Sequence, residues 1–190
     1  MNYFKKIFIL LLFTLISSGV IAANFIGIVG VSIGDVKNKN NQKLENGSKI
    51  FYGDTIIVGS KSTAQILFLD QTVMTIGEES ELTIDEFVYD PQTSDGKLIS
   101  NIKSGTVKVI TGQISRKNPN NLEVKIPTGT IGARGTEFVV VASSNAESTV
   151  LLLGPGPNNS LGMMPGTLEV SDGINTVNIA QPGFETVVTK

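Results

Sequence analysis

The sequence lacks the residues on which much enzyme chemistry depends. It contains no histidine, no cysteine and no tryptophan. Without them a Ser-His-Asp triad, a Cys-His pair and a histidine zinc site cannot be built. Beyond the first 22 residues the only tyrosines are Tyr52 and Tyr89, so aromatic platforms for stacking sugars or bases are scarce. These gaps exclude most hydrolytic chemistry, and we expect neither a metal site nor a cofactor.

The absence of cysteine also bears on the compartment. The fold needs no disulfide in an oxidising environment, and a lipid anchor on cysteine is excluded. A disulfide-free chain of this size suits a bacterial periplasm or cell surface better than a small disulfide-stapled secreted module.

Positive charge is sparse. If residues 1–22 are removed, 13 basic and 17 acidic side chains remain, a net charge of −4. No block of basic residues occurs, so we do not expect nucleic acid as a partner.

The first residues have the pattern of an export signal. Lys5 and Lys6 precede an apolar stretch at residues 7–16, and residues 20–23 offer small-residue cleavage patterns. This predicts a signal peptide over residues 1–22, a periplasmic or extracellular location, and no membrane span after cleavage. The alternative is an uncleaved anchor, because residues 7–23 almost reach the length of a membrane span.

The remainder, residues 23–190, predicts one all-β domain of about a dozen short strands. Apolar and polar residues alternate at 107–109, 122–126 and 177–179, which is typical of half-buried strands. Continuous apolar runs at 66–69, 138–142 and 150–153 indicate central strands buried on both faces. Turn residues punctuate these runs, so we expect a twisted β-roll or β-helix-like arrangement, or a sandwich.

Three stretches rich in asparagine, lysine, glycine or proline predict loops: 37–43, 116–121 and 154–166. The last contains Met163 and Met164. Two adjacent methionines either tuck against the core or form a small adaptable apolar contact for a partner.

The most distinctive segment is residues 127–138, in which three glycines crowd around Arg134. Glycine is needed where the backbone takes positive φ or where another strand approaches closely, so this arginine is expected in a tight bend.

Several such motifs occur in one order along the chain. They are Gly53-Asp54 before a strand, a strand ending in Asp70, and the series Gly132, Gly135, Thr136, Glu137 and Phe138. This order resembles the FecR domain, the periplasmic part of ferric-citrate-sensor-type proteins and of many stand-alone secreted proteins. The resemblance covers about residues 44–141, and more loosely the tail to 190. It implies an all-β, exported, non-catalytic module.

Two departures limit what the resemblance implies. Gln71 follows Asp70 where the family usually has glycine, so this hairpin is expected to use another turn. Sensor members carry a cytoplasmic anti-sigma segment and a full membrane span before the domain. Only the predicted signal peptide stands there in this sequence, so we do not carry over signalling across the inner membrane.

The marked residues have structural and functional interpretations. Gly53-Asp54 and Asp70 predict turns whose carboxylates accept backbone N–H groups, and the alternative is an acid catalyst or metal ligand. Arg134 has two interpretations. It is either a structural arginine, paired with Glu137 or a turn aspartate, or its guanidinium is exposed and binds a carboxylate or phosphate on a ligand. Glu78, Glu79 and Glu81 match no calcium-loop pattern.

Three functions therefore compete. The first is an exported, non-catalytic FecR-type binding or scaffold module that interacts with another envelope protein or a cell-wall polymer. The second is a self-assembling surface or matrix protein, a homo-oligomer built through exposed sheet edges. The third is a glycosidase that uses paired carboxylates, since that chemistry needs no histidine.

Overall fold

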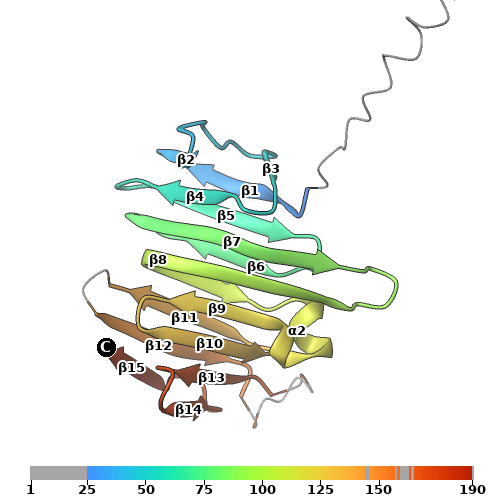
Figure 1. The fold of residues 1–190 in the computed structure, drawn as a ribbon, viewed down its shortest axis with the longest axis vertical. Helices are drawn as coiled ribbons and strands as arrows, with labels where there is room; N and C mark the ends of the chain where they lie inside the picture. Colours follow the sequence, from blue (N-terminus) through green and yellow to red (C-terminus); the bar gives the residue numbers. More distant parts are fainter. Residues whose placement is uncertain (1–24, 144–145, 157, 159–162, 164, 190) are drawn as a thin grey trace, which may run out of the picture.

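The structure is a computed structural model, and it describes residues 25–143, 146–156, 158, 163 and 165–189. Within these residues the chain forms fifteen strands and two short helices (Figure 1). The strands are β1 (Gly27–Ile33), β2 (Val36–Asn38), β3 (Lys49–Ile50), β4 (Thr55–Val58), β5 (Thr63–Phe68), β6 (Val73–Ile76), β7 (Ser80–Tyr89), β8 (Gly96–Ile110), β9 (Leu122–Ile126), β10 (Gly129–Arg134), β11 (Glu137–Ala142), β12 (Glu147–Gly154), β13 (Thr167–Ser171), β14 (Thr176–Ile179) and β15 (Glu185–Thr189). The helices are α2 (Gln113–Lys117) and the 3₁₀ helix η2 (Pro119–Asn121). The predicted all-β class is confirmed. The predicted signal peptide lies outside the described residues.

The fifteen strands form one hydrogen-bonded network folded into two layers. In the first layer the order is β3-β1-β5-β6-β8-β11-β12-β15. In the second it is β2-β4-β7-β8-β9-β10-β13-β14. Every described pair is antiparallel except β8 with β9, which is parallel.

Strand β8 belongs to both layers. Its first part, through Ser104, pairs with β7, and its last part, from Gly105 onward, pairs with β11 and then also with β6. The strand crosses between the layers at Gly105, where φ is +92°. A Cβ at this position would lie 2.5 Å from the Cα of Ser80. Glycine is therefore required at the crossing by both its backbone angle and its neighbour.

The core lies between the two layers. Alternation along β5 buries Ala64, Ile66 and Phe68 and leaves the residues between them partly exposed. Phe68 of the first layer stacks on Phe87 of the second, with ring centroids 5.7 Å apart. The side chains thus follow the period of two that the sequence shows, one face inward and one outward.

The expectation of strands buried on both faces was wrong. In β11 and β12 burial alternates, and Val141 and Leu153 are exposed. A two-layer fold has one inner face per sheet, so an uninterrupted apolar run also places apolar side chains outside.

The predicted loop at 116–121 is also corrected. Residues 116 and 117 end α2, and residues 119–121 form η2. Asn118 accepts a hydrogen bond from the Asn120 N–H, and Pro119 occupies the first position of η2, where a missing N–H costs nothing. A five-residue helix is too short to show a helical stripe in the sequence.

Candidate functional site

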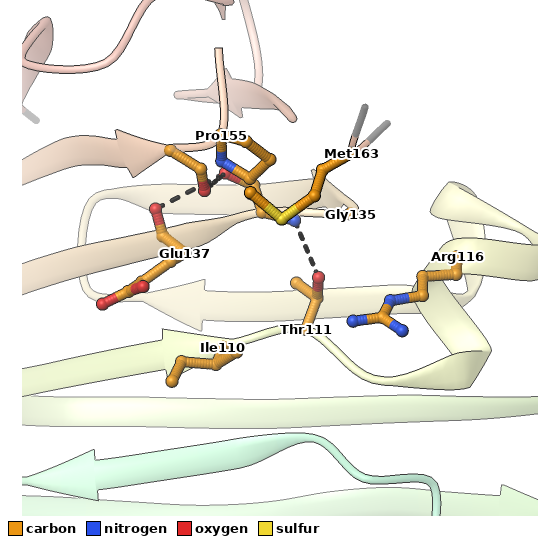
Figure 2. A pocket seen from close by; sticks show the side chains of 9 residues that line it. Ile110, Thr111, Arg116, Gly135, Glu137, Pro155 and Met163 are labelled. Carbon is orange, nitrogen blue, oxygen red and sulfur yellow. Dashed lines mark hydrogen bonds between the residues drawn. The ribbon is translucent and has the colours of Figure 1, made fainter. Parts of the chain in front are cut away.

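The chain segment that enters β11 borders a pocket of about 600 Å³, which Arg116 of α2 also lines (Figure 2). Described residues from four parts of the chain line it: Ile110, Thr111, Arg116, Gly135, Thr136, Glu137, Gly154, Pro155 and Met163. The pocket therefore contains part of the distinctive glycine-arginine segment, together with the end of β12 and the connection between β8 and α2.

Thr136 joins three of these parts. Its N–H donates to the Thr111 hydroxyl oxygen at 2.8 Å, and its carbonyl accepts from the Thr111 N–H at 3.0 Å. The Thr136 hydroxyl donates to the Gly154 carbonyl at 2.8 Å. Because Thr136 is buried and lines the pocket, these bonds fix one wall, the pocket floor, where the ends of β8, β11 and β12 meet.

Helix α2 is held on two sides, which positions Arg116. The buried Ser115 hydroxyl donates to the Ala133 carbonyl of β10. Lys117 pairs with Asp95 at 2.8 Å and donates to the Thr93 carbonyl. Arg116 itself is exposed, and its guanidinium points into the pocket (Figure 2).

The two charged residues of the pocket differ in their partners. Glu137 forms an ion pair with Lys108 of β8. Among the described residues, Arg116 forms no ion pair. Figure 2 shows the Glu137 carboxylate and the Arg116 guanidinium at opposite sides of the pocket. The Arg116 charge is therefore not neutralised by the acid that shares the pocket.

The glycines of the distinctive segment have different roles. Gly135 has φ of +56° and turns the chain from β10 into β11. Gly132 lies within β10 without positive φ, and an added Cβ would come no closer than 3.9 Å to another atom. Positive φ therefore explains the glycine at 135, and neither backbone nor packing explains the one at 132.

Arg134 ends β10 opposite Thr167 of β13, and it does not line the pocket. It is exposed and has no ion pair in the described part of the chain. The suggested pairing with Glu137 was wrong, because Glu137 pairs with Lys108. The role of Arg134 in ligand binding stays a prediction.

The two marked aspartates lie in turns and do not line the pocket. Gly53 has φ of +78°, and the Asp54 carboxylate accepts the Phe51 N–H at 2.8 Å. Asp70 is fully buried, and its carboxylate accepts the Thr72 N–H at 3.1 Å and the Thr72 hydroxyl at 2.8 Å. Gln71 takes φ of +71° in this hairpin, so the turn forms without the family's glycine.

The remaining motif residue, Phe138, is buried in the core next to the pocket floor. It is among the largest fully buried side chains of the described chain. Its role is to anchor the start of β11, which positions Thr136 and Glu137.

Ionisable groups with displaced pKa values are all exposed. The Gln92 N–H and the Thr93 hydroxyl lower the pKa of Asp90, Lys117 lowers the pKa of Asp95, and hydrogen bonds from Asn175 lower the pKa of Asp172. None of these aspartates lines the pocket.

The acidic cluster at residues 78–81 is engaged in local contacts. Glu78 accepts the Lys61 N–H at 2.7 Å, and Glu81 pairs with Lys103 at 3.1 Å. In the residues that the structure covers, no three histidine, cysteine or acidic side chains are grouped closely enough to hold a metal ion.

Among the described residues, no helix has the length and apolar character needed to cross a membrane.

Sequence reasoning missed Arg116 and left open where Met163 lies. Arg116 stands in a stretch that predicted a loop, and only the fold brings it beside Gly135. Met163 is 48% exposed and lines the pocket, whereas Met164 lies outside the described residues. The only signal that could have indicated Arg116 was the small number of arginines. The chain has two, and the glycines around Arg134 directed the prediction to that one instead.

A family model described as FecR protein matches residues 54–154, more than half of the chain. No curated protein matches the sequence. The match confirms the resemblance and ends at Gly154, so it includes the floor of the pocket but not Pro155 or Met163. Members of this family that act as sensors hold the domain in the periplasm. This chain belongs to the FecR family of regulatory and sensor proteins of the bacterial envelope.

Proposed function

We propose that this chain is an exported, non-catalytic FecR-type binding module that engages another protein of the bacterial envelope. The family assignment supports an envelope role, and the predicted signal peptide supports export.

The proposal rests on one observation: the two sheet edges at the C-terminal end are unpaired among the described residues and carry exposed apolar side chains. Strands β14 and β15 are the last of their layers, and each has a described partner on one side only (Figure 1). Both strands, and the turn before each, carry exposed apolar side chains. These are Ile174 (92% exposed), Val177 (46%), Phe184 (60%) and Val187 (52%). Unpaired N–H and C=O groups beside apolar side chains are what an added strand binds.

The opposite end of the layers is protected. Strand β2 has three residues and β3 has two, and both are far shorter than a typical docking strand. Lys37 and Lys43 form an isolated bridge beyond β2, so the chain covers this edge itself. Natural sheets use short strands and lysines to block added strands. The described residues of β14 and β15 include no lysine, and these strands have four and five residues.

Charge indicates the chemistry of the partner. After Arg134, every described charged side chain is acidic: Glu137, Glu147, Glu169, Asp172 and Glu185. Glu137 is neutralised by Lys108, which leaves a net negative C-terminal end. The segment that fits is extended, with apolar residues on alternate positions and lysine or arginine between them.

The test is site-specific crosslinking in living cells. A photo-crosslinking residue replaces Val177 or Val187 at the edges, and Val31, an exposed valine of β1, serves as the matched control. We expect both edge sites to form an adduct with one and the same envelope protein, and Val31 to form none. The paired change Val177→Lys and Val187→Lys places edge lysines, and it should abolish the adduct monitored from a crosslinker at Phe184.

Other outcomes contradict this function in distinct ways. Adducts between two copies of the chain favour the self-assembling surface protein. Adducts from Val31 as readily as from the edges show that contact is non-specific. No protein adduct from either edge excludes strand addition, and a wall polymer then becomes the better partner. Export is checked separately by the N-terminal sequence of the cellular protein, which should begin near residue 23.

A further inference from the structure

We propose that the pocket at the start of β11 is a ligand site for a small amphipathic carboxylate, whose charge Arg116 binds. This inference goes beyond the proposed function and does not depend on it, since it concerns different residues.

The size of the pocket suits a small molecule. Its volume of about 600 Å³ lies within the range of roughly 300–1,000 Å³ typical of small-molecule sites. Its floor is held by buried hydrogen bonds of Thr136 to Thr111 and Gly154, so this part of its shape exists before any ligand binds.

Its walls are suited to an apolar body. Ile110 and Met163 are 36% and 48% exposed although both are large and apolar, and Pro155 also lines the pocket. Exposed apolar side chains that face one cavity lose water-contacting surface when an apolar ligand enters. Methionine adapts its shape to such a ligand because it has three rotatable bonds.

One charge is available to the ligand. Arg116 points into the pocket without an ion pair among the described residues, whereas Glu137 is bound to Lys108 at the other side. A guanidinium presents two parallel N–H groups that match a carboxylate. A single cation beside apolar walls favours a monoanion with an apolar body over a strongly hydrated phosphate.

The experiment compares three probes with the same eight-carbon body: octanoate, 1-octanol and octylamine. Binding to the processed full chain is measured by calorimetry and located by amide NMR shifts of Gly135 and Gly154. We expect octanoate to bind about ten-fold or more tightly than octanol, as loss of a charge-assisted hydrogen bond requires. Octylamine should bind more weakly still, because its ammonium faces Arg116.

Two variants test whether Arg116 is the residue that binds the octanoate carboxylate. Arg116→Gln should reduce octanoate binding to the level of octanol and leave octanol unchanged. Lys103→Gln removes one exposed positive charge elsewhere and should change neither, which controls for net charge. An unchanged NMR spectrum away from the pocket shows that each variant is folded.

Three results would overturn the proposal. The first is no binding of octanoate at about 10 mM. The second is equal binding of octanoate and octylamine, which indicates a site that ignores charge. The third is loss of octanoate binding in Arg134→Gln but not in Arg116→Gln, which would make the glycine-flanked arginine the binding residue.

Discussion

At the residue scale, Thr136 is the side chain on which the pocket depends. Its hydroxyl reaches the Gly154 carbonyl at the end of β12, and its backbone pairs with Thr111 after β8. The buried Thr136 thus connects Thr111, 25 residues before it, with Gly154, 18 residues after it.

We predict that Thr136→Val lowers the free energy of unfolding by about 1–2 kcal/mol. Valine keeps the shape of threonine but cannot donate to the Gly154 carbonyl, which then loses a hydrogen-bond partner. Thermal unfolding should shift down by about 2–8 °C for a chain of this size. Thr136→Ser keeps the hydroxyl and should cost less. If serine costs more than valine, packing of the methyl group and not the hydrogen bond is what matters.

Asp70 is the second residue whose substitution should lower the stability of the whole fold. It is fully buried and holds the Thr72 hydroxyl, which in turn accepts the Gly112 N–H. We predict that Asp70→Ala destabilises by roughly 2–3 kcal/mol, because it leaves the buried Thr72 groups without their acceptor. Denaturant unfolding of Asp70→Ala and Asp54→Ala checks this.

Asp54 is the matched comparison. It makes a similar turn contact with the Phe51 N–H but is only half-buried, so water can replace part of what is lost. Equal destabilisation by the two variants would contradict the importance of burial at Asp70.

The residue scale is also where sequence reasoning reached its limit. Turn chemistry predicted that Gly53-Asp54 and Asp70 lie in turns, because aspartate competes for local N–H groups. The glycines around Arg134 led the sequence analysis to name it, and not Arg116, as the candidate ligand-binding arginine. Which arginine faces a cavity depends on the Ser115–Ala133 contact between α2 and β10, and no local pattern encodes that contact.

At the element scale, β8 determines the architecture. Its two parts belong to different layers, and the crossing lies at Gly105 beside Ser80. The sequence predicts strands at this position from alternation, but alternation continues on both sides of a bend. The inward-facing positions change from even (Leu98, Ser100, Ile102) to odd (Val107, Val109) across Gly105. This change marks a break but does not say which strands each part pairs with, so the choice between roll and sandwich could not be made from the sequence.

We predict that Gly105→Ala destabilises the protein by about 1–3 kcal/mol, since alanine at φ of +92° is strained and its Cβ meets Ser80. Gly132→Ala is the matched control in β10, where φ is not positive and space is available. The control should stay within about 0.5 kcal/mol of the parent. Denaturant unfolding of both variants measures the difference, and a similar loss in both would contradict the role assigned to the crossing.

At the scale of the whole molecule, the charge inventory predicts how stability depends on pH. The chain has no histidine and no cysteine, so no side chain has an unperturbed pKa between about 5 and 8. The carboxyl groups of Asp90, Asp95 and Asp172 have folded-state pKa values below the ordinary 3.8. Above 3.8 their contribution to stability is fully present, and it is lost as the pH falls through their folded-state pKa values.

We therefore predict a melting temperature that is constant from pH 8 to about 5 and that falls below about 4. Melting curves across this range measure it. Replacing the three aspartates with asparagine should make the acid-side fall shallower, because the variant has three fewer groups whose pKa differs on folding. A marked change in melting temperature between pH 6 and 7 would contradict the prediction.

The two-layer stack has a mechanical consequence. Strand β1 lies near one end of the stack and β15 ends the other, so the described chain enters and leaves at opposite ends (Figure 1). A pulling force between these ends is perpendicular to the strands and therefore parallel to the hydrogen bonds that join them. Such a force opens the ladders one bond at a time, whereas a force along the strands must break many bonds together. A tethered copy held at both ends would yield to a small tension, and it would release its outer strands before its core.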